Sequence, residues 1–155
     1  MAPEGKTSAG RVVCRNRKAA RDYFIEERLE AGLVLKGTEV KSLRDGRAEL
    51  LDGYVAVEEG EAWLVNVHIG QWPQASYFNH EPRRRRKLLL QRRQINKLRA
   101  MLEQRGYTAI PLKIYFNDKN LAKVEIGLAR GKRKADKRAT IRDRDERRQQ
   151  QRGEQ

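Results

Sequence analysis

Cysteine is almost absent from this sequence: the 155 residues include a single one, Cys14. One thiol cannot form a disulfide within the chain, and no cluster of His and Cys residues offers the three or four ligands of a zinc site. We therefore expect neither a metal nor any other cofactor. Cys14 is more simply interpreted as a small packing residue than as a nucleophile.

Long apolar runs are also missing. No segment approaches the roughly 18 consecutive apolar residues that cross a bilayer, and residues 1–10 lack the apolar stretch of a secretory signal. We expect a cytoplasmic protein with no membrane contact. Hydrophobic residues make up 38% of the chain, which is enough for one modest core but not for two. Residues 1–10, rich in Gly, Ala, Ser and Pro, are expected to form a disordered leader.

Acidic residues are missing from one segment in particular. Residues 83–93 carry seven Lys or Arg and no Asp or Glu, whereas residues 22–78 carry eleven acids and five bases. Residues 1–21 and 131–155 are again basic, and the net charge is +14. Like charges gathered in this way repel one another in the folded state. A polyanion that neutralises them is the natural explanation, and nucleic acid is the leading candidate.

Several segments alternate between apolar and polar residues with the period of a half-buried strand. Residues 23–35 place apolar side chains at most odd positions, and residues 112–128 predict a hairpin with its turn at 117–120. Two further strands are expected after Ala48, joined by the polar turn 58–61. Their predicted core-facing residues are Trp63, Val65, Val67 and Ile69.

Three short helices are expected between the strands. They cover residues 17–21, 37–44 and 91–105, with Asn16 and Thr38 as caps of the first two. The third carries an apolar stripe at helical spacing, formed by Ile95, Leu98, Met101 and Leu102. Because strands and helices do not alternate regularly, the fold class predicted is mainly β, a small closed barrel rather than a layered α/β sheet.

The apolar pattern ends near residue 131. We therefore predict one domain over residues 11–130 and a basic C-terminal tail over residues 131–155. Ile141 is the only large aliphatic residue of that tail, which cannot bury enough surface to offset the entropy of ordering. The tail is expected to be disordered in isolation and to become helical when it docks on a partner. A solubilising tail is the alternative.

Six sequence blocks occur in a characteristic order: residues 23–26 (YFIE), 30–35 (EAGLVL), 37–44 (GTEVKSLR), 86–90 (RKLLL), 111–116 (PLKIYF), and Gly131-Lys132 with Asp136-Lys137-Arg138. Together they resemble the SsrA-binding protein family, or small protein B, from about residue 14 to residue 138. The resemblance implies an oligonucleotide-binding-fold barrel that binds transfer-messenger RNA (tmRNA, SsrA RNA). It also implies delivery of that RNA to stalled ribosomes for rescue by trans-translation, with no catalysis by the protein.

The resemblance and the charge pattern together predict two RNA-contacting surfaces. Cations on the first would bind tmRNA phosphates and release counterions, so that affinity falls steeply with salt. The residues expected there are Asn16, Arg17, Lys18, Glu30, Lys36, Arg83, Arg84, Arg85, Arg86, Lys87, Leu90, Gln91, Arg92 and Arg93. The second surface, implied by the resemblance, would contact ribosomal RNA through Arg21, Gly131, Lys132, Arg133, Lys134, Asp136, Lys137, Arg138 and Ile141.

Some of these residues have two open interpretations. Glu30 would either accept hydrogen bonds from base amino groups or form a structural salt bridge at the barrel edge. Leu90 fits a core contact as well as an apolar contact with an unstacked base. The aromatic residues Trp72, Tyr77 and Phe78 are expected to close one end of the barrel rather than stack on bases.

The resemblance also implies a mechanism. The barrel would stand in for the missing anticodon stem of a tRNA-shaped complex, and the tail would probe the empty message channel of the small ribosomal subunit. The expected partners are therefore tmRNA and the ribosome, with no small-molecule substrate, and the protein is expected to be a monomer off the ribosome.

Two other classes of function fit the composition. A general RNA-binding or ribosomal protein would carry the same charge. An RNA-cleaving enzyme would need His68 or His80 as an acid or a base beside a carboxylate, although a structural or solvated role suits both histidines better.

Overall fold

The protein is described by a computed structural model over residues 11–75 and 78–131, and this part of the chain is mainly β. Its strands are β1 (Val12–Arg15), β2 (Tyr23–Leu33), β3 (Ala48–Glu49), β4 (Tyr54–Glu58), β5 (Glu61–Val65), β6 (His68–Ile69), β7 (Arg86–Leu89), β8 (Tyr107–Phe116) and β9 (Ala122–Gly131). Its helices are α2 (Ala19–Asp22), α3 (Gly37–Arg44) and α4 (Arg92–Leu102).

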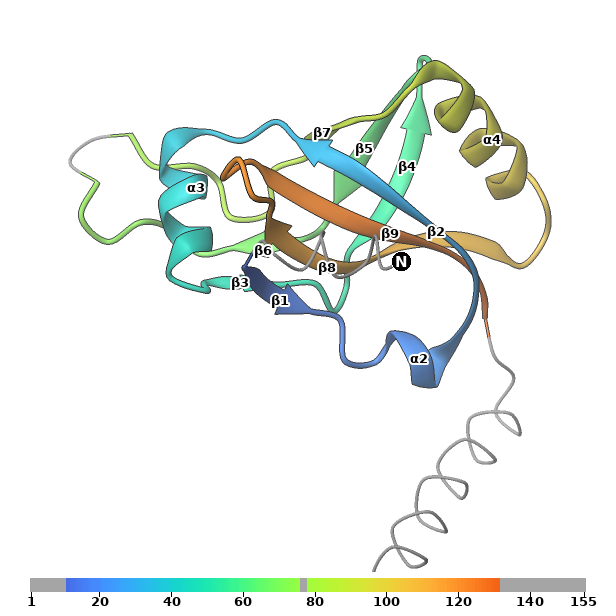
Figure 1. Cartoon of the computed structure of the whole chain (residues 1–155), viewed down its shortest axis with the longest axis horizontal. Coiled ribbons are helices and arrows are strands. Elements are labelled where there is room, and N and C mark those ends of the chain that lie inside the picture. The colour runs from blue at the N-terminus through green and yellow to red at the C-terminus, as the bar shows by residue number, and fades with distance from the viewer. Residues whose placement is uncertain (1–10, 76–77, 132–155) are drawn as a thin grey trace, which may run out of the picture.

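One antiparallel sheet organises the domain. Seven strands follow the order β1-β8-β9-β2-β7-β5-β4, and β3 pairs with β6 in a separate two-stranded sheet. The large sheet curls until β4 lies against β8. Within the described residues its hydrogen-bonded ladder ends at β1 and β4, so the predicted closure into a barrel is not confirmed. Figure 1 shows α3 and α4 at opposite ends of the curled sheet.

The sequence periods predict the long elements well. β2 alternates between half-buried odd positions and exposed even positions up to Glu30, as expected for residues 23–35. Helix α4 buries Leu98 completely and packs Ile95, Met101 and Leu102 against the same core. Cys14 also packs against that core, and burial raises the pKa of its thiol to about 11.

The helix caps differ from the prediction because both expected cap residues have other partners. The side-chain amide of Asn16 donates to the carbonyl of Pro111, and Lys18 rather than Asn16 occupies the cap position of α2. Thr38 lies inside α3, where its hydroxyl contacts His80. The residue before α3 is Lys36, whose backbone N–H donates to Glu39 Oε1 at 2.7 Å.

The predicted inward face of residues 63–69 is correct for only half of the segment. Val67 and Ile69 are fully buried, but Leu64 is buried in place of Trp63 and Val65, which are half-buried. Asn66 separates the two phases with a left-handed backbone angle, φ 61°. One residue in this conformation breaks the two-residue period, so the inward face changes from even to odd positions.

A bulge has a similar effect in β8. Its pairing with β9 shifts between Pro111 and Lys113, so Leu112 does not share a face with Ile114 and Phe116 as predicted. Ile114 and Phe116 belong to the main core, whereas Leu112 packs with Ile110 in a second cluster. The predicted hairpin itself is present, and Asn120 forms its turn with φ 63°.

The domain boundary differs by one residue from the prediction. Gly131, assigned to the tail from the sequence, ends β9 and pairs with Tyr23 at the start of β2. The predicted leader (residues 1–10) and the remaining tail residues lie outside the described residues.

Candidate RNA-binding site

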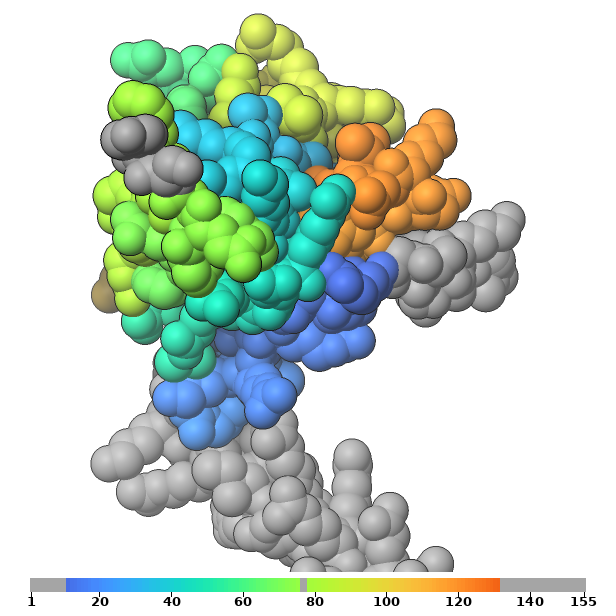
Figure 2. Space-filling view, turned by 90° about the vertical axis from the view of Figure 1, so that its left-hand side faces the viewer, coloured from blue at the N-terminus to red at the C-terminus, as the bar shows by residue number. Residues whose placement is uncertain are grey.

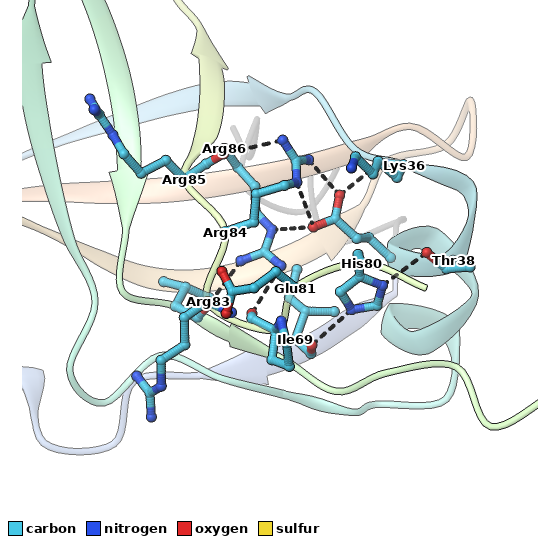
Figure 3. A network of polar contacts seen from close by, with 12 residues as sticks. Lys36, Thr38, Ile69, His80, Glu81, Arg83, Arg84, Arg85 and Arg86 are labelled. Carbon is cyan, nitrogen blue, oxygen red and sulfur yellow. Dashed lines mark hydrogen bonds and ion pairs between the residues drawn. The ribbon is translucent and has the colours of Figure 1, made fainter. Parts of the chain in front are cut away.

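The alternation of β7 separates neighbouring cations. Arg86 and Leu88 point inward and are buried, whereas Lys87 is partly exposed and Leu89 is exposed. The alternation continues into the preceding loop: Figure 3 shows Arg84 and Arg86 pointing toward the same carboxylate, while Arg83 and Arg85 point away from it. The basic run is therefore divided between the interior and the surface.

The inward arginines meet Glu39 from helix α3. Arg86 Nε donates to Glu39 Oε2 at 2.6 Å and Arg84 donates to Glu39 Oε1 at 2.6 Å. The guanidinium of Arg86 also donates to the carbonyls of Val67 and Pro82, at 2.8 and 3.0 Å. The side chains of Glu39 and Arg86 are both 0% exposed. The prediction that Arg86 contacts RNA phosphates is thus wrong for this conformation, because its cation has no exposed surface.

These partners lower the pKa of Glu39. Burial alone would raise it, but hydrogen bonds from Arg84 and from the Lys36 backbone, together with the charge of Arg86, outweigh that effect. The carboxylate of Glu39 therefore stays ionised, and its ion pair with Arg86 connects α3 to the start of β7. The sequence contained one signal of this role: Arg86 shares its strand face with Leu88, a core residue.

His80 extends the same structural network. The loop that carries it lies beside α3 (Figure 2). The buried imidazole places Nδ1 2.9 Å from Thr38 Oγ1 and Nε2 2.9 Å from the carbonyl oxygen of Ile69. A carbonyl oxygen only accepts, so Nε2 donates to Ile69, while Nδ1 is engaged with the Thr38 hydroxyl. Both nitrogens are thus engaged in the fold, which leaves neither for the acid–base role of an RNA-cleaving enzyme.

The outward cations are exposed but paired with acids of the β4–β5 hairpin. Arg85 donates to Glu58 at 2.9 Å, and Lys87 donates to Glu61 at 3.0 Å. The Arg85 guanidinium also lies over the ring of Trp63, 4.8 Å from its centroid. Trp63, predicted as a core residue, is therefore a half-buried surface residue that supports a cation. Arg83 donates to the side chain of Asn66 at 2.9 Å.

A groove of about 630 Å³ brings several predicted tmRNA-binding residues together. It lies between the β4–β5 hairpin, the end of β7 and the start of α4. Lys87, Leu90, Gln91 and Arg92 line it, and the exposed Arg93 follows in the same helix. Leu90 also packs against the core, so its core contact is confirmed without excluding an edge toward the groove. Backbone N–H of Gln91 donates to Gln94 Oε1 at 3.0 Å, fixing the start of α4.

The other predicted tmRNA-binding residues lie elsewhere. Asn16 and Arg17 line a second groove of about 580 Å³ beside α2, and Lys18 lines a third nearby. Figure 1 shows α2 and α4 well separated on the domain. Lys36 is exposed before α3. The structure therefore does not gather all predicted residues into one site.

Within the described residues the structural partner of Glu30 is a tyrosine hydroxyl rather than the cation of a salt bridge. Glu30 accepts a hydrogen bond from the phenol of Tyr115 on β8. Burial and the bond to Glu30 raise the pKa of Tyr115, so that phenol stays protonated as the donor. Glu30 itself remains exposed.

Arg21 and the root of the tail lie close together. Arg21 precedes Asp22, to which it donates at 3.1 Å, and the next residue, Tyr23, pairs with Gly131. Residues Lys132, Arg133, Lys134, Asp136, Lys137, Arg138 and Ile141 lie outside the described residues. Of the aromatic residues expected to pack, Trp72 is partly buried, but Phe78 is 91% exposed, so packing is wrong for Phe78. Tyr77 lies outside the described residues.

Comparison with known proteins decides the family. A model of the SmpB protein matches residues 13–155. The chain belongs to the SmpB protein family. Among its SmpB relatives, an SsrA-binding protein of Rhizobium etli (strain CIAT 652) is 53% identical over 150 residues, covering 96% of this chain and 94% of the relative. One of Leifsonia xyli subsp. xyli (strain CTCB07) is 56% identical over 147 residues, covering 95% and 92%.

The fold is also found among solved SmpB structures. A chain described as "tmRNA-SmpB: a journey to the center of the bacterial ribosome" matches with a TM-score of 0.69 and 47% sequence identity, covering 84% of this chain and 94% of that chain. The family predicted from the six sequence blocks is confirmed. No helix within the described part of the chain is long and apolar enough to span a membrane.

Proposed function

We propose that this protein binds tmRNA and delivers it to stalled ribosomes for rescue by trans-translation. The observation that carries the proposal is the SmpB family match over residues 13–155, with SsrA-binding proteins 53% to 56% identical over nearly the whole chain. The solved structure described as "tmRNA-SmpB: a journey to the center of the bacterial ribosome" supports both partners.

The groove between the β4–β5 hairpin and α4 is the tmRNA contact that the geometry supports best. It combines an apolar edge at Leu90, a hydrogen-bonding amide at Gln91 and cations at Lys87 and Arg92. Phosphates would be held by the exposed cations, while Leu90 and Gln91 contact an unpaired base. Arg83 and Arg85 extend the basic surface, and Arg84 and Arg86 act through the fold by holding β7 against α3.

A second tmRNA contact lies on the α2 side, where Asn16, Arg17 and Lys18 border grooves. Two separated contacts suit a folded RNA with two exposed loops. Glu30 would contact the RNA through its exposed carboxylate, and Lys36 would contact it through its exposed cation. In this arrangement the domain stands in for the missing anticodon stem, as a partly open version of the oligonucleotide-binding barrel in which β4 packs against β8.

The ribosome-facing surface is proposed from the position of the tail. Because Gly131 pairs with Tyr23, the described part of the chain ends close to Arg21. We assign Arg21 and the basic tail residues to the same contact with small-subunit ribosomal RNA. The tail would become ordered only where messenger RNA does not fill the message channel of the small subunit. An empty channel would therefore be the signal for rescue.

The protein acts in this proposal by positioning RNA, without catalysis, in the cytoplasm and as one copy of the chain. Peptide tagging on ribosomes stalled at the end of a truncated message tests it. The full chain with tmRNA should support tagging, whereas a chain ending at Gly131 should bind tmRNA and fail to tag. Tagging that proceeds equally well without the protein contradicts the proposal, and undiminished tagging by the shortened chain refutes the role of the tail.

A further inference from the structure

The outer face formed by β4, β5, β7 and the residue before β7 brings cations and carboxylates close together. Trp63 pairs with Lys87 across the β5–β7 ladder, and Glu58 pairs with Glu61 across β4–β5. Two ion pairs lie on this face: Arg85–Glu58 at 2.9 Å and Lys87–Glu61 at 3.0 Å. The acidic hairpin therefore occupies the same cations that the proposed tmRNA contact uses.

These ion pairs can exchange partners. Their side chains are between 41% and 57% exposed, so each pair is solvated and contributes little to stability. A phosphate offers Arg and Lys the same kind of charged acceptor as a carboxylate. The Trp63 ring beneath Arg85 supports the guanidinium from its other side and keeps it at the surface when the acidic partner changes.

We propose that Glu58 and Glu61 are selectivity-determining residues for RNA, an inference that rests on the proposed tmRNA binding. They hold Arg85 and Lys87 in ion pairs that are released only when an RNA presents phosphates at both positions. An RNA of another shape leaves the pairs closed and meets two carboxylates beside the groove, which repel its backbone. Selectivity is thus produced by a penalty on unsuitable RNA as well as by contacts to the correct one.

The same hairpin provides a matched control. Glu59 lies at its tip with φ 52°, is exposed and lines the same groove, but it forms none of the ion pairs found among the described residues. E58Q/E61Q frees both cations, whereas E59Q removes one negative charge nearby without breaking a pair. Single variants E58Q and E61Q match the charge change of E59Q.

The experiment measures binding of the full-length variants to tmRNA and to bulk elongator tRNA over a range of salt. E58Q/E61Q should bind tRNA tighter by roughly 2- to 5-fold for each freed cation. Its slope of log K against log salt for tRNA should steepen by about 1.4 to 1.8, that is, about 0.7 to 0.9 for each of two new phosphate contacts. The slope for tmRNA should stay unchanged, because that RNA already uses both cations. E59Q should leave both slopes unchanged.

Two results overturn the inference. The first is an effect of E59Q on tRNA binding equal to that of E58Q or E61Q, which would indicate general repulsion. The second is a salt slope for tmRNA that steepens in E58Q/E61Q as much as the slope for tRNA does. The proposed function fails by a different result, equal binding of the two RNAs by the wild-type protein. The two failures are therefore distinguishable in one set of titrations.

Discussion

Four consecutive arginines, residues 83–86, show how strongly surroundings decide the role of a side chain. Arg86 is buried against Glu39, whereas Arg85 is 45% exposed on its side chain and lies over Trp63. Charge counting alone assigns all four to RNA. The strand period gives the better prediction, because Arg86 lies two residues before the buried Leu88 and must share its face.

Replacement of Glu39 tests the buried network. E39Q leaves the charge of Arg86 buried without a counter-ion, so the free energy of unfolding should fall by about 3–5 kcal/mol at pH 7. E49Q, at an exposed position outside the described ion pairs, should change it by less than about 0.5 kcal/mol. Urea unfolding measures both. A loss for E39Q as small as that for E49Q would contradict the structural role of the pair.

The lowered pKa of Glu39 also predicts a pH dependence. A depressed folded-state pKa contributes stability that is present above the unfolded value, about 4.3, and is lost as the pH falls through the folded value. The difference in stability between wild type and E39Q should therefore shrink as the pH falls below about 4.3. Parallel stability curves from pH 7 down to pH 3 would contradict this.

Cys14 should react slowly for a thiol. Burial raises its pKa to about 11, so at pH 8 its thiolate fraction is on the order of 10²-fold smaller than that of a free cysteine. Alkylation by iodoacetamide should be slower in the native protein by at least that factor and should reach the free-cysteine rate in urea. Equal rates in the two states would show that the thiol is not buried.

At the scale of elements, hydrophobic periodicity predicts whether a segment is a helix or a strand and where it lies in the sequence. It does not always predict which residues of a strand face the core. β2 and α4 follow from apolar periods of two and of about 3.6 residues that keep one phase along the element. The inward faces of residues 63–69 and 112–116 do not, because Asn66 and the bulge at Pro111–Lys113 each shift the phase. A single left-handed residue or a one-residue bulge leaves no clear mark in a hydrophobic pattern, so these shifts needed the structure.

The chain is closely packed at Gly53, the residue before β4. A Cβ at Gly53 would lie 2.4 Å from Val67 Cγ2 and 3.1 Å from Pro111 Cγ. G53A should therefore lower the free energy of unfolding by about 1–3 kcal/mol through overpacking. G37A, where a Cβ meets nothing within 4 Å, should be neutral or slightly stabilising. Thermal unfolding compares them, and equal stability of the two variants would contradict the close packing.

At the scale of the whole molecule, the sequence predicts the family better than the geometry of the site. Ordered blocks such as residues 37–44 and 86–90 identify SmpB because many positions agree at once. They do not show that Lys87, Leu90, Gln91 and Arg92 share a groove while Asn16 and Arg17 border another. That division depends on how the sheet curls, which pairs residues far apart in the chain.

The central claim is that this folded domain prefers one RNA over others of similar charge. Competition between labelled tmRNA and an excess of elongator tRNA for the full-length protein, at physiological ionic strength, tests it most directly. We predict that tmRNA stays bound when tRNA is present in at least tenfold excess. Displacement of tmRNA in proportion to the amount of tRNA added would contradict the account.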